Sequence, residues 1–291
     1  MSNATAPEFV TRKVWCTSPS GLHGMAYAEW GERDNPRVLL CVHGLTRNGR
    51  DFDDLARAMA GDYRVICPDV VGRGLSDWLR DPAGYGIRQY VADMVVLIAR
   101  LDVEAVHWLG TSMGGIIGMA LASLEDTPVS RLLLNDVGPT IEPESIRRIG
   151  ENLGRAPKFD TLDDAERFIR LVSATFGNLS DAQWRHLTET SLRQMPDGRL
   201  EMRYDPRIAE SFQRATADEE LGLWPIYDRI RCPTRVLRGE NSDLLSLETV
   251  RAMASRGPRP EIIEVPGVGH APMFMDDSQI SMVRSFFTGP R

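Results

Sequence analysis

Several features that would identify whole classes of protein are missing from this chain. Lys and Arg total 34 against 41 Asp and Glu, and the net charge of −7 provides no basic excess for binding phosphates. We therefore expect neither nucleic acid nor an anionic membrane as a partner. No apolar run approaches the roughly 18 residues of a transmembrane helix. The polar stretch Met1–Thr11 lacks the basic and apolar segments of a signal peptide.

Cysteine is also scarce, because the chain has only four: Cys16, Cys41, Cys67 and Cys232. None belongs to a CxxC pair, so the sequence predicts neither a disulfide framework nor a thiolate zinc site. Cys41 and Cys67 lie within apolar runs, where a free thiol behaves as a small hydrophobic group. This usage favours a reducing, cytoplasmic compartment.

What the 291 residues do contain is an alternation of short apolar runs with helical patterns. The first two runs, Val10–Thr17 and Leu22–Trp30, are predicted to form a hairpin. Later runs have the pattern of strands buried on both faces: Val38–Val42, Tyr63–Cys67, Ala105–Leu109, Arg131–Leu134, Thr234–Leu237 and Glu261–Val265. Helical patterns follow several of them: Asp51–Ala60, Ile87–Leu101, Met113–Leu124, Ser246–Ser255 and Asp277–Phe287. The alternation predicts an α/β fold with a doubly wound, mostly parallel sheet of eight strands.

One stretch, from about Pro139 to Pro225, interrupts this alternation. It contains no convincing buried strand, but it has helical, charge-mixed segments at Leu162–Ser173 and Asp181–Gln194. A stretch of about 85 residues is too long for a structureless loop in a compact domain. We therefore expect a helical insertion between two sequence blocks of one core domain.

A G-x-S-x-G motif lies at residues 110–114, with Ser112 at its centre. The motif alone is weak, but here it follows a predicted strand and opens a predicted helix. That context suits a nucleophilic serine on a strained turn, where neighbouring glycines let the backbone crowd together. The start of the helix also presents free N–H groups to an anion. The alternative is a purely structural role, in which the motif forms a Gly-rich turn and the serine caps the helix.

A serine nucleophile needs a base and a carboxylate that orients the base. Of the five histidines, only His270 lies in a loop after the last predicted strand, flanked by Gly and Pro. The acid is expected in a loop after a late strand, and Asp243 is our first choice. Asp136, after the preceding strand, and Glu240, on the same loop as Asp243, are the alternatives.

Together these motifs resemble those of the α/β-hydrolase fold family. The resemblance rests on His43–Gly44, the loop Pro68–Ser76, the elbow at Ser112, the acid loop at Asp243 and the pair Gly269–His270. They span nearly the whole chain apart from the insertion. The resemblance implies an α/β-hydrolase core at residues 1–138 and 226–291, with a helical cap inserted at 139–225.

The resemblance also implies an oxyanion hole formed by the backbone N–H groups of Leu45 and Met113. His43 is expected to form structural hydrogen bonds rather than to act as a base. Members that resemble epoxide hydrolases and haloalkane dehalogenases have Asp at the elbow, so the serine here disfavours those reactions. Gly72 and Gly74 do not complete a GxGxxG motif, so a dinucleotide site is not supported.

The expected reaction is acyl transfer to water, in which Ser112 attacks, His270 takes its proton and Asp243 orients the imidazole. We expect a small-molecule acyl substrate, either a carboxylic ester or a lactone. We expect no metal or organic cofactor. The sequence is also compatible with a homo-oligomer. A carbon–carbon bond hydrolase and a ligand receptor with little turnover are the alternatives. Several aromatic residues could line the acyl pocket or only form the cap core: Trp78, Phe159, Phe168, Phe176, Trp184 and Trp224.

Overall fold

An eight-stranded sheet forms the centre of the computed structural model of the protein, which describes residues 8–216 and 222–289. Its strands are β1 (Phe9–Ser18), β2 (Gly21–Trp30), β3 (Val38–Val42), β4 (Arg64–Pro68), β5 (Val106–Thr111), β6 (Val129–Asn135), β10 (Thr234–Gly239) and β11 (Glu261–Val265). Their order across the sheet is β1-β2-β4-β3-β5-β6-β10-β11. The β1–β2 and β2–β4 pairings are antiparallel and the others are parallel, as the sequence predicted.

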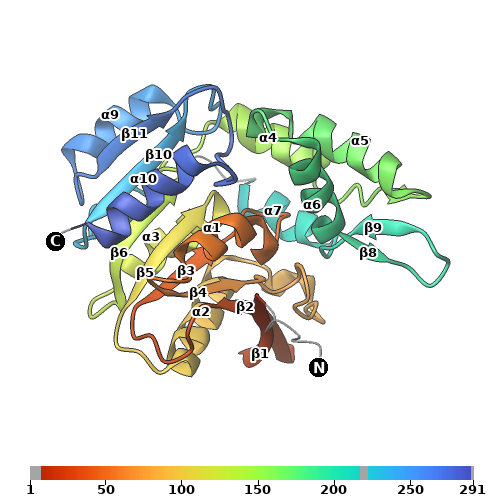
Figure 1. Ribbon diagram of the computed structural model, residues 1–291, viewed down its shortest axis with the longest axis horizontal. Helices are drawn as coiled ribbons and strands as arrows, with labels where there is room; N and C mark the ends of the chain where they lie inside the picture. The colour runs from red at the N-terminus through yellow and green to blue at the C-terminus, as the bar shows by residue number, and fades with distance from the viewer. Residues whose placement is uncertain (1–7, 217–221, 290–291) are drawn as a thin grey trace, which may run out of the picture.

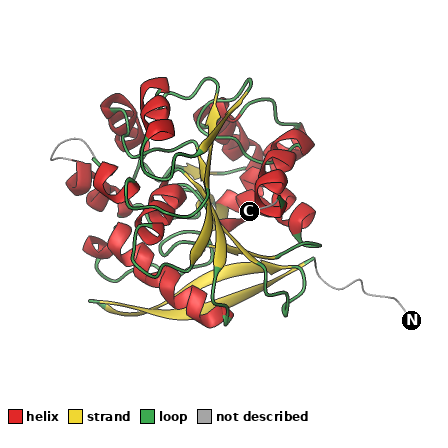
Figure 2. Ribbon diagram, turned by 90° about the vertical axis from the view of Figure 1, so that its left-hand side faces the viewer, coloured by secondary structure: helices red, strands yellow, loops and turns green. Residues whose placement is uncertain are grey.

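Helices cover both faces of this sheet (Figure 2). Apolar residues of α1 (Asp53–Met59) and α10 (Asp277–Thr288) belong to one core cluster. Those of α2 (Ile87–Leu101), α3 (Met113–Ala122) and α9 (Leu247–Ser255) belong to another. Residues of β3 and β4 are buried throughout, because a strand between two helical layers has no solvent-facing side. The predicted bounds of β3, α2 and β11 are confirmed, and the other core elements shift by one or a few residues at one or both ends.

Between β6 and β10 the chain leaves the main sheet and forms a separate layer, drawn in green to cyan in Figure 1. Its helices are α4 (Pro143–Asn152), α5 (Leu162–Val172), α6 (Asp181–Ser191), α7 (Ile208–Thr216) and α8 (Trp224–Tyr227). The helices of the expected insertion are present, but three short strands were not predicted. A small antiparallel sheet of β7 (Lys158–Phe159), β9 (Leu200–Met202) and β8 (Leu192–Gln194) is also present.

These strands were not predicted because they are very short. A strand of two or three residues produces no visible alternation of apolar and polar residues. The turn residues Pro196, Asp197 and Gly198, which separate β8 from β9, are the signal that could have predicted the hairpin. Gly198 has a φ of 86°, which L side chains rarely adopt.

Two further expectations concern a signal peptide and a membrane-spanning helix. Residues 1–7, 217–221 and 290–291, which include most of the stretch considered for a signal peptide and part of the predicted cap, lie outside the described residues. Among the described helices, none is both long enough and apolar enough to span a membrane.

Candidate active site

Ser112 lies on a sharp turn between β5 and α3. Its φ of 51° and ψ of −116° place it in a backbone region that non-glycine residues rarely occupy. The turn depends on the glycines that flank it. A Cβ on Gly114 would lie 2.0 Å from the Val42 carbonyl oxygen, and one on Gly110 would lie 2.3 Å from the Gly114 carbonyl carbon. The strand–turn–helix context predicted for the motif is therefore present.

His270 lies in the loop between β11 and α10, and its Nδ1 is 2.8 Å from Oδ2 of Asp136. The loop is held from both sides. A Cβ on Gly239, at the end of β10, would lie 2.3 Å from the Gly269 carbonyl oxygen. On the other side, the Thr175 hydroxyl donates to the His270 carbonyl at 2.7 Å. These contacts restrict the imidazole to a position beside the ends of β6 and β10.

Asp136 directly follows β6 and is completely buried, with a relative exposure of 0%. Its Oδ1 accepts the Gly239 N–H at 2.8 Å, and its Oδ2 accepts the Ser242 hydroxyl at 2.7 Å as well as His270 Nδ1–H. An ionised carboxylate accepts several hydrogen bonds and donates none. The imidazole proton is therefore held on Nδ1, which leaves Nε2 free to act as a base.

The prediction that Asp243 would orient His270 is wrong as a matter of geometry. Asp243 forms an ion pair with Arg148 instead, and its side chain is 39% exposed. The other candidate on this loop, Glu240, accepts the Gly267 N–H at 2.7 Å through Oε2. The alternative, Asp136, makes the contact. The Gly239 N–H at the end of β10 and the Ser242 hydroxyl in the following loop donate to its carboxylate and turn it toward His270.

Of the two predicted oxyanion-hole residues, Leu45 lies in the loop after β3 and Met113 is the first residue of α3. His43 orients the first of these peptides. The Val70 N–H donates to His43 Nε2 at 2.9 Å, so the ring proton lies on Nδ1 and is donated to the Gly44 carbonyl at 2.7 Å. That carbonyl belongs to the peptide unit that carries the Leu45 N–H. Burial lowers the pKa of His43 to about 3, so the ring is neutral, and its predicted structural role is confirmed.

Asp69 connects two loops beside the site and was not singled out from the sequence. Its Oδ1 accepts the Gly49 N–H at 2.8 Å and its Oδ2 accepts the Leu75 N–H at 2.7 Å. Burial raises the pKa of this carboxyl group to about 6, against the opposing effect of these hydrogen bonds. Its position in the Pro68–Ser76 loop, directly after β4, was the available signal.

The aromatic residues considered for an acyl pocket mostly contact one another or arginines. Phe159 and Trp184 are buried, and each has a ring partner in the layer formed by the chain segment that follows β6 and precedes β10. The ring centroids are 5.4 Å apart for Phe159 and Phe168, and 6.4 Å apart for Trp184 and Phe176. Trp78 and Trp224 lie beneath arginine guanidinium groups, those of Arg193 and Arg256, at 4.2 Å. These contacts favour packing roles for them.

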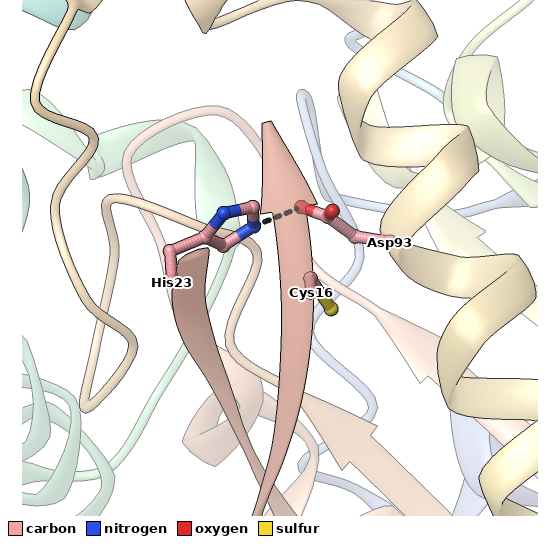
Figure 3. A group of neighbouring side chains, drawn as sticks. All are labelled: Cys16, His23 and Asp93. Atoms are coloured by element: carbon pink, nitrogen blue, oxygen red, sulfur yellow. Dashed lines mark hydrogen bonds and ion pairs between the residues drawn. The ribbon is translucent and has the colours of Figure 1, made fainter. Parts of the chain in front are cut away.

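One group of metal-type side chains occurs among the described residues, formed by Cys16, His23 and Asp93, with donor atoms within 4.8 Å of one another (Figure 3). Hydrogen bonds account for this arrangement. His23 Nε2 lies 3.0 Å from Oδ2 of Asp93, and the other carboxylate oxygen accepts Gln89 Nε2–H at 2.7 Å. Burial raises the pKa of the Cys16 thiol to about 12, which opposes the thiolate that a metal requires. We assign the group to the contact between the β1–β2 hairpin and α2.

Comparisons with known proteins identify the family to which this fold belongs. A family model described as the alpha/beta hydrolase family matches residues 39–279. The 3-hydroxybutyrate-oligomer hydrolase of Cupriavidus necator is 52% identical over 284 residues, which cover 95% of this chain and 97% of the relative. The 2-(acetamidomethylene)succinate hydrolase of Mesorhizobium japonicum is 23% identical, over 82% of this chain and 83% of the relative.

Solved structures show the same relationship. The crystal structure of an alpha/beta hydrolase from Novosphingobium aromaticivorans superimposes with a TM-score of 0.86 at 36% identity, covering 97% of this chain and 98% of that one. The family model covers most of the chain, and the Cupriavidus relative matches nearly its whole length. The chain therefore belongs to the alpha/beta hydrolase family, and the protein is a hydrolase.

Proposed function

We propose that the protein is a serine hydrolase of carboxylic esters, with Ser112 as the nucleophile, His270 as the general base and Asp136 as the residue that orients the imidazole. The observation that carries this proposal is the 2.8 Å contact between His270 Nδ1 and Asp136 Oδ2. The elbow serine, with its strained backbone, is tied to the same strand end, because the Ser112 N–H donates at 3.1 Å to the carbonyl of Asn135, the residue before Asp136. Nucleophile, base and orienting acid are the three groups that acyl transfer to water requires.

The reaction proceeds in two halves. Ser112 Oγ attacks the ester carbonyl carbon as His270 Nε2 takes its proton, and the imidazolium is stabilised by Asp136. The carbonyl oxygen becomes an oxyanion, which accepts hydrogen bonds from the Leu45 and Met113 N–H groups. The tetrahedral intermediate collapses, and His270 gives the proton to the leaving alkoxide. Water then attacks the acyl-enzyme with His270 as base, which releases the acid and restores the Ser112 hydroxyl.

Oligomers of 3-hydroxybutyrate are the substrate class that we propose. They are linear esters, and each ester bond joins the carbonyl carbon of one unit to the oxygen of the secondary alcohol of the next. Their cleavage is therefore the reaction described above. The support is the relative of that name, which is 52% identical to this chain. This relationship favours ester cleavage over carbon–carbon bond cleavage.

We further propose that residues 139–225 act as a cap that selects the substrate. Two bonds to the His270 loop support this role: the Thr175 hydroxyl donates to the His270 carbonyl, and the Gly269 N–H donates to the Thr175 carbonyl, both at 2.7 Å. A third, from Arg47 Nη1 to Ser191 Oγ at 2.9 Å, joins the loop after β3 to α6. We also propose a cytoplasmic location, because all four cysteines are free, as is usual in a reducing compartment.

Ser112→Ala tests the proposal, with the exposed Ser255→Ala of α9 as a matched control. Both variants and the wild type are assayed with p-nitrophenyl butyrate and with the dimer and trimer of 3-hydroxybutyrate. We expect steady, multiple turnover of all three substrates by the wild type and the control, and none by Ser112→Ala. Full activity of Ser112→Ala would contradict the nucleophile assignment. A single burst of product from the wild type, followed by stalled turnover, would instead favour a ligand receptor with little turnover.

A further inference from the structure

Arg73, in the loop after β4, is a completely buried arginine with no carboxylate partner among the described residues. Its Nε donates to the Leu45 carbonyl at 2.8 Å, and its Nη1 donates to the Val71 carbonyl at 2.8 Å and to the Tyr90 hydroxyl at 2.9 Å. Its Nη2 lies 3.7 Å from the Met113 sulfur atom. Every one of these partners is electrically neutral.

Burying an arginine loses several kcal/mol of solvation free energy unless other groups replace the water around the charge. Carbonyl oxygens, a hydroxyl group and the faces of two tyrosine rings replace it here. The guanidinium carbon lies 5.0 Å from the Tyr90 centroid and 5.8 Å from that of Tyr85. These dipoles stabilise the cation without neutralising it. A net positive charge therefore remains in a region of low dielectric constant, where its field is weakly screened.

The position of this charge relates it to the proposed reaction. Two of its four polar contacts are with Leu45 and Met113, the residues whose N–H groups we propose as the oxyanion hole. The bond to the Leu45 carbonyl fixes the orientation of the loop after β3, and the Met113 contact lies at the first residue of α3. Burial is the main cause of the lowered pKa of His43, in the same loop as Leu45, and the nearby charges of Arg73 and Arg47 lower it further.

We propose that Arg73 is a positioning residue of the oxyanion hole: it holds Leu45 and Met113 in a fixed relation, and its buried charge stabilises the oxyanion of the tetrahedral intermediate. The inference rests on the proposed function. It predicts an effect that appears in the transition state and not in ground-state binding, because the ester carbonyl carries no full charge before Ser112 attacks.

Two variants test this role, Arg73→Met, which removes the charge, and Arg73→Lys, which keeps the charge but loses the planar fork. Arg64→Met is the matched control. Arg64 is also a buried arginine close in sequence, but it bonds to Glu29 and to the Leu101 carbonyl, away from the site. The readouts are kcat and KM for p-nitrophenyl butyrate, normalised to the end-point stoichiometry of fluorophosphonate labelling, and the inhibition constant of a trifluoromethyl ketone, which forms an oxyanion on addition of the serine.

Removing one oxyanion donor directly costs about 100- to 1,000-fold in kcat. Because Arg73 acts through those donors, we expect Arg73→Met to lower kcat by about 10- to 100-fold with KM changed by less than about threefold. Affinity for the ketone should fall by the same factor as kcat. Arg73→Lys should recover part of both losses, and Arg64→Met should lose thermal stability with kcat per labelled site unchanged.

Two results would overturn the inference. One is a wild-type kcat per labelled site in Arg73→Met, and the other is a loss of kcat with unchanged affinity for the ketone. If Arg73→Met fails to fold, Arg73→Lys decides the question, because equal kcat and equal ketone affinity in that variant would show that the fork has no positioning role. These outcomes differ from failure of the proposed function, which would appear as activity in Ser112→Ala.

Discussion

Replacing Asp136 by Asn is expected to disable the proposed base without disturbing the main sheet. The carboxylate accepts three hydrogen bonds, from His270 Nδ1, the Ser242 hydroxyl and the Gly239 N–H. An asparagine has one carbonyl oxygen and one NH₂ group, so it cannot accept at both ends. If its oxygen faces Gly239, its NH₂ group faces His270 and drives the ring proton to Nε2. In that tautomer, His270 cannot take the proton from Ser112.

The magnitude follows from this geometry. The same substitution in the serine protease triad lowers kcat by about 10,000-fold through the wrong tautomer. We expect a loss of about 1,000- to 10,000-fold here, or about 4–5.5 kcal/mol of transition-state stabilisation. The opposite rotamer would place the NH₂ group against the Gly239 N–H. Two donors facing each other at a fully buried site cost about 1–3 kcal/mol, so that rotamer offers no escape.

Asp243→Asn is the matched control, because it makes the same chemical change on the neighbouring loop. The Asp243 side chain is 39% exposed and its partner Arg148 is 49% exposed, and ion pairs of this kind contribute less than about 1 kcal/mol. The Ser145 hydroxyl bonds to the Asp243 backbone carbonyl, which the substitution leaves in place. We therefore expect kcat/KM to stay within about threefold of wild type.

The assay compares kcat/KM for p-nitrophenyl butyrate in the two variants, with circular dichroism and thermal melting to establish the folded fraction. The reasoning would be refuted if Asp243→Asn were the more damaging change. It would also be refuted if Asp136→Asn retained more than about a tenth of the wild-type kcat/KM, since a wrong tautomer cannot be that active. Either result would return the role of orienting acid to the loop after β10.

The core fold was predictable because its signals are local. A strand covered by helices on both faces is mostly apolar; β3 shows this pattern throughout, and β4 shows it from Val65 to Cys67. The helix α2 buries Tyr90, Met94 and Leu97 at helical spacing, so both its bounds could be predicted. The β7–β9–β8 sheet was missed because its strands have only two or three residues, too few to show an alternation of apolar and polar side chains.

The orienting acid was not predictable to the same degree, because the choice depends on a side chain's reach across a few ångströms. β6 and β10 are neighbouring parallel strands, so the loops that follow them carry Asp136 and Asp243 to the same edge of the sheet. Both carboxylates satisfy the order and the spacing that the sequence shows. What separates them is a pair of donors, the Gly239 N–H at the end of β10 and the Ser242 hydroxyl in the loop after it, which turn Asp136 toward His270.

Arg73 illustrates a different limit. In the sequence it is a charged residue in a Gly-rich loop, where arginines are usually exposed. Its burial depends on the Leu45 carbonyl of the loop after β3, on the Val71 carbonyl of its own loop and on tyrosines in and before α2. These groups meet only when the sheet has formed. Sequence patterns that describe one element at a time do not contain such contacts.

The remaining predictions concern stability. Gly114→Ala should lower the free energy of unfolding by about 3 kcal/mol or more, because its Cβ would lie 2.0 Å from the Val42 carbonyl oxygen. Gly61→Ala, where a Cβ would meet nothing within 4 Å, is the control in urea unfolding. The second prediction uses two buried groups with opposite pKa shifts. His43, with a pKa of about 3, withholds a proton that the unfolded chain binds below about pH 6.5, so the stability present above that pH is lost as the pH falls. Asp69, with a pKa of about 6, holds a proton that the unfolded chain releases above about pH 4, so its contribution is lost as the pH rises. Between pH 4 and 6 each slope approaches about 1.4 kcal/mol per pH unit, and the two oppose each other. Urea unfolding across this range should therefore give slopes of opposite sign in His43→Gln and Asp69→Asn relative to wild type. Parallel profiles in the two variants would show that these groups do not control the acid response.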